Sequence, residues 1–241
     1  MKKILLLLIT IPTLLLSQSY DWQNSAPKID EAAHNDGQGP TALSDNGSVI
    51  IIGASQADDN GSNSGHVRVF QHSSGVWSQI GSDIDGVAAE DKFGYSVTIS
   101  SDGSIIASGG IHNDDNGNNS GHVRVFENIS GTWTQIGSDI YGEAADDQFG
   151  VAVSLSSDGS IIAIGANVND GGAYNAGHVR VFENISGVWT QIGSDIDGQS
   201  YGEEFGYRLS LNSNGTILAV GAYASSSGDG TARIYENISG T

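Results

Sequence analysis

Three copies of a His-x-Arg pair are the residues of this chain best suited to acid–base chemistry. They are His66 and Arg68, His122 and Arg124, and His178 and Arg180, spaced 56 residues apart. Residues two apart on a strand point to the same side, so each pair presents an imidazole and a guanidinium together. An active site is usually a single asymmetric cluster, whereas these pairs recur in every full copy. We therefore predict no catalytic residue and expect each Arg to pair with a carboxylate of a neighbouring repeat.

Two runs of carboxylate and amide side chains are candidates for metal binding. The candidate calcium ligands are Asp58, Asp59, Asn60, Asp114, Asp115 and Asn116. Oxygen donors of this kind are the ligands that Ca²⁺ prefers. Neither run matches the EF-hand loop, because glycine stands at its fourth position and no Glu closes it at the twelfth. The sequence leaves two interpretations open, calcium binding and solvated turns, and it indicates no other cofactor.

These residues belong to a unit that repeats along most of the chain. The segment 65–70 returns at 121–126 and 177–182, and a weaker copy at 230–235 follows after 53 residues. A fixed period of this size indicates one supersecondary unit stacked on its neighbours, because each unit alone leaves an apolar face uncovered. We place the repeats at about 30–85, 86–141, 142–197 and 198–241.

One unit predicts four antiparallel strands. In the second copy the alternation and turn residues place strands over 94–99, 105–107, 121–126 and 132–136. Four-stranded repeats of this length are typical of the blades of a β-propeller. A β-solenoid has shorter coils, and a separate sandwich of this size would bury too little surface. We therefore predict an all-β protein, a β-propeller of four-stranded antiparallel blades with four repeats present.

The number of blades has two solutions. The last repeat stops after its third strand, and residues 20–29 resemble the missing fourth strand. Either four blades close into a ring with 20–29 as the closing strand, or the chain is the first part of a larger propeller. Propellers have about four to eight blades, so both solutions stand.

The first 19 residues predict a signal peptide. Lys2 and Lys3 precede an apolar stretch over 4–16, and the small residues of 17–19 suit a cleavage site. The apolar stretch is too short for a confident membrane span, which needs roughly 20 residues. We expect a secreted or cell-surface protein, with residues 20–241 as the propeller and no membrane insertion after cleavage.

The mature chain is strongly acidic. The full sequence has a net charge of −19, and removal of Lys2 and Lys3 takes it to −21. This charge disfavours nucleic acid and anionic membranes as partners and favours cations or basic surfaces. Loops between the second and third strands and loops between repeats share one end of antiparallel strands, and they carry most of the acidic residues. We expect one acidic loop face.

The apolar motifs of the repeat resemble a known family. Phe149-Gly150 followed by Ile164-Gly165-Ala166 resembles the FG-GAP repeat, the blade of the integrin α-subunit propeller and of many bacterial secreted proteins. Phe205-Gly206 with Val220-Gly221-Ala222 fits as well. The resemblance covers residues 30–241 and implies adhesion or extracellular recognition.

Two repeats depart from this pattern. The first has Gly37-Gln38 where Phe-Gly is expected, and the second has Gly109-Gly110 in place of Gly-Ala. The family often carries a calcium loop between these two motifs, but here the corresponding turn holds a single carboxylate, such as Asp102. One carboxylate cannot supply the six to eight oxygens that calcium takes, so the family's site does not transfer.

The functional prediction follows from the resemblance and the charge. We predict an exported, non-enzymatic recognition or adhesion module that binds an extracellular protein or glycan through its acidic loop face, with calcium dependence if the two acidic runs bind the ion. One alternative is a secreted propeller enzyme that acts on polysaccharide as a hydrolase or lyase. The other is a structural spacer.

Overall fold

The described part of the chain consists of β-strands and turns, which confirms the all-β prediction. The computed structural model describes Ile29 and residues 38–223 and 229–238. The expected signal peptide lies outside the described residues, as do Gly37 and all of the expected closing strand except Ile29. Within the described residues, no helix has the length and apolar character that a membrane crossing requires.

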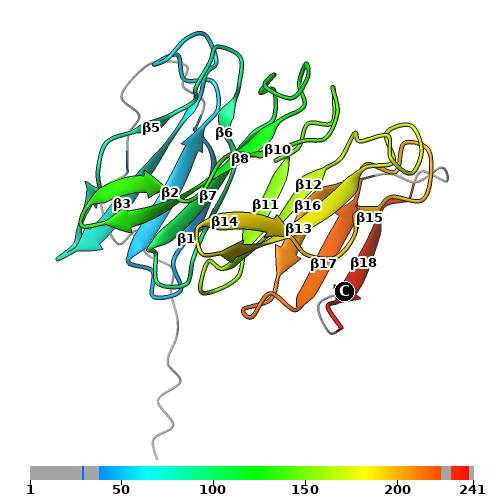
Figure 1. The fold of residues 1–241 in the computed structure, drawn as a ribbon. Helices are drawn as coiled ribbons and strands as arrows, with labels where there is room; N and C mark the ends of the chain where they lie inside the picture. Colours follow the sequence, from blue (N-terminus) through cyan, green and yellow to red (C-terminus); the bar gives the residue numbers. More distant parts are fainter. Residues whose placement is uncertain (1–28, 30–37, 224–228, 239–241) are drawn as a thin grey trace, which may run out of the picture.

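Four antiparallel sheets follow one another in chain order (Figure 1). The first contains β1 (Gln38–Leu43), β2 (Val49–Ala54), β3 (His66–Ser73), β4 (Val76–Gln79) and β5 (Ile84–Asp85). The second contains β6 (Phe93–Ile99), β7 (Ile105–Gly110), β8 (His122–Ile129), β9 (Thr132–Gln135) and β10 (Ile140–Tyr141). The third contains β11 (Ala152–Leu155), β12 (Ile161–Ala166), β13 (His178–Ile185), β14 (Val188–Gln191) and β15 (Ile196–Asp197). The fourth contains β16 (Phe205–Leu211), β17 (Ile217–Ala222) and β18 (Thr231–Glu236).

The expectation of four strands per repeat needs one correction. In the first three sheets the outer strand is broken into two short strands, both paired with the third strand, as β4 and β5 pair with β3. The chain turns at Gly81, which has a φ of 72°. That left-handed conformation favours glycine and interrupts the strand. The break brings Asp83 close to His66 and Arg68 at the start of β3.

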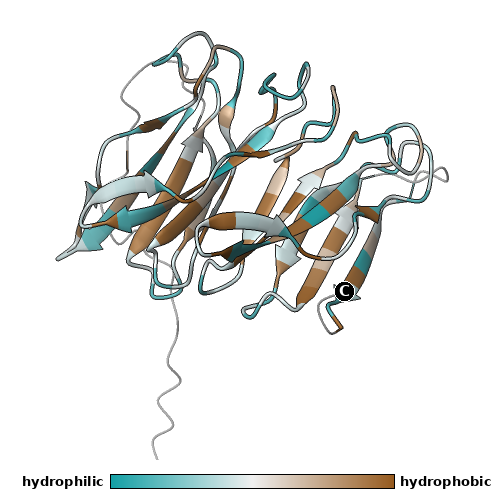
Figure 2. Ribbon diagram, in the orientation of Figure 1, coloured by the Kyte–Doolittle hydropathy of each residue, from teal (hydrophilic) through white to brown (hydrophobic). Residues whose placement is uncertain are grey.

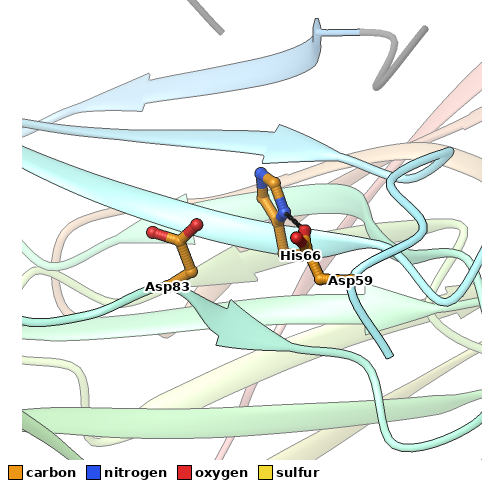
Figure 3. Close-up of side chains that lie close together, drawn as sticks. All are labelled: Asp59, His66 and Asp83. Atoms are coloured by element: carbon orange, nitrogen blue, oxygen red, sulfur yellow. Dashed lines mark hydrogen bonds and ion pairs between the residues drawn. The ribbon is translucent and has the colours of Figure 1, made fainter. Parts of the chain in front are cut away.

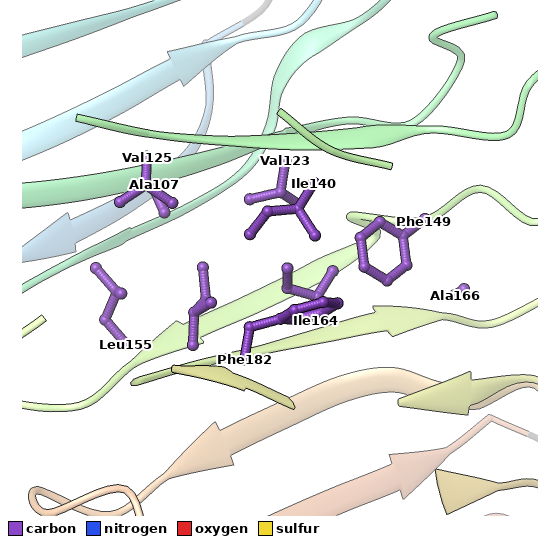
Figure 4. Close-up of a cluster of buried hydrophobic side chains, with 10 residues drawn as sticks. Ala107, Val123, Val125, Ile140, Phe149, Leu155, Ile164, Ala166 and Phe182 are labelled. Atoms are coloured by element: carbon purple, nitrogen blue, oxygen red, sulfur yellow. The ribbon is translucent and has the colours of Figure 1, made fainter. Parts of the chain in front are cut away.

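The core lies between consecutive sheets rather than within any one of them. Figure 2 shows apolar residues concentrated along the middle strands of each sheet. The second strands of the first three sheets, β2, β7 and β12, are almost entirely buried, whereas β17 of the fourth sheet alternates exposed and buried residues along its first half. Figure 4 shows the cluster in which Val123 and Ile140 of the second sheet pack with Ile164 and Phe182 of the third and with Phe149 of the connection between them. Each sheet therefore depends on its neighbour for burial, as expected for stacked repeats.

The first strands of the sheets, β1, β6, β11 and β16, lie next to one another. Their hairpin turns are linked by backbone hydrogen bonds, from Asp45 N to Ser101 O at 3.0 Å, Ser101 N to Ser157 O at 2.9 Å, and Ser157 N to Ser213 O at 2.8 Å. These turns are five-residue connections, and each contains an Asn-Gly or Asp-Gly pair. Within the described residues, no strand pairing joins the first sheet to the fourth.

Candidate functional site

Each of the first three sheets places a histidine, an arginine and an aspartate together near the start of its third strand, where the loop from the second strand enters. The histidines are His66, His122 and His178, all at most 2% exposed. The aspartates are Asp83, Asp139 and Asp195, which follow the break in the outer strand. Each accepts a hydrogen bond from a glutamine of that strand, as from Gln79 Nε2 to Asp83 Oδ1 at 2.6 Å. Sequence reasoning missed these aspartates, although they lie 17 residues after each histidine in all three copies.

The arginines hold sheets and loops together. Arg68 Nε donates to Asp83 Oδ2 of its own sheet at 3.0 Å, rather than to a neighbouring repeat as expected. Arg124 Nη1 donates to the Asp85 carbonyl of the preceding sheet at 2.9 Å, and Arg180 Nη1 to the Tyr141 carbonyl at 3.1 Å. The Arg180 guanidinium also lies 5.0 Å from the centre of the Phe182 ring, a cation–π distance.

The three clusters differ in their further carboxylate. In the first sheet, Asp59 Oδ2 lies 2.7 Å from His66 Nδ1 (Figure 3). In the third sheet the further carboxylate is Glu143, which comes from the connection after the second sheet. In each of these two clusters the candidate metal-ligand atoms lie within 4.8 Å of one another. His122 pairs with Asp139, whose Oδ2 lies 3.0 Å from Nδ1 at ion-pair distance, and among the described residues no third ligand group completes a cluster there. The near-identical sequence repeats therefore do not give identical clusters.

A hollow of about 570 Å³ opens on the loop face beside the Glu143 cluster. It lies between the connection over 143–148 and the loop between β12 and β13. Its lining includes Glu143, Asp146, Asp147, Asp170 and Tyr174. The exposed Tyr174 ring stacks on that of Tyr201, with centroids 5.3 Å apart and planes at 26°. The hollow thus combines carboxylates with an aromatic surface.

Hydrogen bonds from backbone N–H groups to carboxylates fix the walls of this hollow. Asp147 is 3% exposed, and its Oδ2 accepts the backbone N–H groups of Ala144 at 2.9 Å and Glu143 at 3.2 Å. Asp170 Oδ1 accepts the N–H of Asn175 at 2.7 Å. The Glu143 side chain is 46% exposed, and its Oε1 lies 3.8 Å from Arg180 Nε. Glu143 is therefore the carboxylate that faces both the hollow and the buried cluster.

The predicted calcium ligands occupy loops on this same face. Asp58 and Asp114 each accept a backbone N–H five residues later, at 2.8 and 2.7 Å. Asn60 and Asn116 donate their side-chain amides to the carbonyls of Gly86 and Gly142, at 2.8 and 2.6 Å. Asp59 contacts His66, and Asp115 lies 3.5 Å from the Tyr141 hydroxyl. The structure thus gives all six a partner within the protein, and calcium binding by them stays a prediction.

The buried His178 predicts a pH-dependent stability. Burial lowers its pKa below the usual value of about 6.5, against the opposing effect of Asp195, Asp147 and Glu143, while Arg180 also lowers the pKa. As pH falls below about 6.5, the unfolded chain therefore binds a proton that the folded chain resists binding. We expect the free energy of unfolding to decrease between pH 7.5 and 5.5, by at most about 1.4 kcal/mol per pH unit for this group.

Urea unfolding at several pH values measures this effect. The His178→Asn variant should show a smaller decrease than the native chain. Some decrease should remain, because burial and Lys92 also lower the pKa of His112. An unchanged pH dependence in His178→Asn would contradict the assignment.

Comparison with known proteins identifies the class of the repeat and then its fold relatives. Residues 84–126 match the family model of the FG-GAP repeat, so the chain contains an FG-GAP repeat and the resemblance drawn from the sequence is confirmed. No curated protein matches the chain.

Solved structures share the fold at low sequence identity. A putative 6-phosphogluconolactonase from Bacteroides uniformis has a TM-score of 0.56 at 16% identity, over 85% of this chain and 52% of that one. The complex of KlAtg21 with the coiled coil of AgAtg16 has 0.54 at 16% identity, over 78% and 50%. The Pseudomonas aeruginosa periplasmic gluconolactonase PpgL has 0.52 at 12% identity, over 81% and 56%. The chain thus spans about half the length of these structures.

These findings correct the prediction of a non-enzymatic recognition or adhesion module. Two of these three solved structures are named 6-phosphogluconolactonase and gluconolactonase, so the shared fold occurs in proteins named as enzymes. The prediction rested on the family resemblance and the charge, and its non-enzymatic part on the recurrence of the His-x-Arg pairs in every full copy. The structure shows that the three pairs are not equivalent, because Asp59 lies beside the first pair and Glu143 beside the third.

Proposed function

We propose that the four sheets are blades of an exported β-propeller, and that the protein is a hydrolase of sugar-derived substrates. The linked inner turns support the propeller, because they place the first strands of all four sheets side by side. The hollow at the interface of the second and third sheets is the proposed substrate site. The observation that carries this proposal is the asymmetric cluster of Glu143, His178 and Asp195 beside that hollow.

The roles follow from exposure and contact. Glu143 lines the hollow and is half exposed, so it is the proposed general base that takes a proton from the attacking water. With a lactone, the water oxygen bonds to the carbonyl carbon, the ring C–O bond breaks, and the leaving oxygen takes a proton from Glu143. Arg180 and the buried His178 position Glu143 and do not touch the substrate. Tyr174 offers an aromatic face on which a sugar ring can pack.

The charge of the hollow selects among sugar substrates. Its lining includes four carboxylates, Glu143, Asp146, Asp147 and Asp170, and the whole chain has a net charge of −19. A phosphorylated sugar would be repelled from such a surface. We therefore propose a neutral sugar lactone or a neutral polysaccharide as substrate, rather than a phosphorylated lactone.

Proton release from gluconolactone in weak buffer tests the proposal, with the spontaneous rate subtracted. The purified chain should accelerate hydrolysis, and Glu143→Gln should reduce kcat/KM by about 100-fold or more, the usual contribution of a general base. A neutral polysaccharide panel, read by release of reducing ends, covers the second substrate class.

The matched control is Glu90→Gln. Glu90 lies on the connection one repeat earlier, where its carboxylate accepts hydrogen bonds from the Asn63 side chain. Glu90→Gln therefore removes the same charge as Glu143→Gln, but away from the hollow. Glu90→Gln should leave the rate unchanged. Equal losses in the two variants, or no acceleration of either substrate class by the native chain, would overturn the proposed function.

A further inference from the structure

We propose that Asp59, His66 and Asp83 form a binding site for one divalent transition metal of the zinc class. The three side chains converge at the loop end of the first sheet, where Asp59 comes from the β2–β3 loop and Asp83 from the break between β4 and β5 (Figure 3). The site lies in a different sheet from the proposed substrate hollow, so the inference goes beyond the proposed function.

The distances suit a metal of this size. Asp59 Oδ2 is 2.7 Å from His66 Nδ1, and the ligand atoms of all three residues lie within 4.8 Å of one another. Zinc binds imidazole nitrogen and carboxylate oxygen at about 2.1 Å, so ligands in a tetrahedron lie about 3.4 Å apart. Small side-chain rotations are enough to reach that geometry. The metal would take the place of the hydrogen bond between Asp59 Oδ2 and His66 Nδ1.

Neighbouring groups already orient the ligands. Asp83 accepts hydrogen bonds from Gln79 Nε2 at 2.6 Å on one oxygen and from Arg68 Nε at 3.0 Å on the other. His66 is 2% exposed, and its strand position directly opposite Asp85 fixes its direction. Metal ligands are commonly held by such outer hydrogen bonds, which reduce the ordering required on binding.

Charge and access also favour an ion here. The carboxylates of Asp59 and Asp83 lie close to His66, Asp85 is its cross-strand neighbour, and the Arg68 guanidinium pairs with Asp83. The Asp59 side chain is 52% exposed, which leaves an entry path and room for a water as fourth ligand. An imidazole ligand selects zinc-class metals over calcium and magnesium, which prefer oxygen donors only.

The other two sheets provide internal comparisons. His122 and Asp139 repeat the same pair, but among the described residues no further carboxylate joins them within ligand distance. In the third sheet, Arg180 Nε lies 3.8 Å from both Glu143 and Asp195, so a guanidinium already bridges the two carboxylates. In the first sheet, Arg68 pairs with Asp83 and leaves Asp59 to His66. In the first cluster Asp59 is thus not paired with an arginine, and we expect an added cation to bind there.

Zinc titration of the chelator-treated full chain tests the proposal. Isothermal calorimetry is run in millimolar calcium and magnesium, which occupy weak acidic sites, and Co²⁺ absorption reports nitrogen coordination. We expect one strong site. His66→Asn should weaken zinc binding by about 100-fold or more, and Asp59→Asn by about 10-fold or more, because loss even of an outer-shell partner of a ligand typically costs about 10- to 100-fold in affinity.

Two matched variants separate a site from general acidity. Asp58→Asn makes the same charge change one residue away, and His122→Asn removes the corresponding imidazole of the next sheet; both should bind zinc like the native chain. Asp59 is exposed, so Asp59→Asn keeps the test valid if His66→Asn fails to fold, as judged by circular dichroism. The absence of a strong site, or equal losses in Asp58→Asn and Asp59→Asn, would overturn the proposal.

Discussion

Replacing Gly165 by alanine is expected to destabilise the protein by about 3 kcal/mol or more, because the new methyl group has no space. A Cβ at Gly165 would lie 2.1 Å from the carbonyl oxygen of Gly206. Gly206 has a φ of +91°, which L side chains rarely adopt, so that backbone cannot easily shift. The third and fourth sheets would have to separate. Urea unfolding of the purified chain measures the loss.

The chain contains its own control for this substitution. Gly221 occupies the same motif position in the fourth sheet, but a Cβ there would meet the Arg208 carbonyl oxygen at 3.6 Å, an ordinary contact. Gly221→Ala should change the free energy of unfolding by less than about 1 kcal/mol. If the two variants lose the same stability, backbone contact between sheets is not what fixes glycine in this motif.

This contact explains a motif that the sequence could show but not interpret. The Phe-Gly and Gly-Ala dipeptides are visible as a repeated pattern, and their spacing predicts successive strands. The structure shows that the glycine of Gly-Ala in one sheet touches the glycine of Phe-Gly in the next, as Gly53 touches Gly94 and Gly165 touches Gly206. This contact joins two different repeats. Strand propensity and turn residues describe only the local structure of one repeat, so they cannot predict it.

The acidic loops were predictable in position but not in role. The sequence predicts carboxylates on one loop face and a partner that binds there. The structure shows that Asp91, Asp147 and Glu203 are buried at equivalent positions, where each accepts backbone N–H groups of its connecting loop. Burial raises the pKa of Asp91, although the hydrogen bond from Ala88 opposes that effect. Part of the acidity therefore stabilises the fold rather than facing a partner.

The candidate site was the least predictable feature. A strict 56-residue period suggests equivalent copies, and Glu143 has no acidic counterpart one repeat earlier, where Val87 stands. The proximity of Glu143 to His178 depends on the path of the connection between sheets and on the break in the outer strand. Neither is encoded in local alternation or turn residues. The signal available in the sequence is the difference between repeats at this position, a glutamate in one copy and a valine in the other.

Replacing Phe149 by alanine is the other substitution with a large expected effect, a loss of about 3–5 kcal/mol. Phe149 is fully buried between the second and third sheets, in the cluster that contains Val123 and Ile164 (Figure 4). Its ring contacts Phe182 edge-on, with centroids 6.4 Å apart, and Arg180 lies 5.3 Å above it. Alanine would leave a cavity and remove the aromatic partner of a guanidinium that joins two sheets.

The position of this ring also predicts how the variant unfolds. Stacked repeats stabilise one another only through shared interfaces, so damage between the second and third sheets uncouples the halves of the array. In Phe149→Ala, hydrogen exchange should accelerate most in β11 and β12 and least in β2, whereas Phe149→Leu, which fills most of the volume, should lose less stability. Equal acceleration in β2 and β12 would mean that the sheets unfold as one cooperative unit, and the interface would not be the element that limits stability.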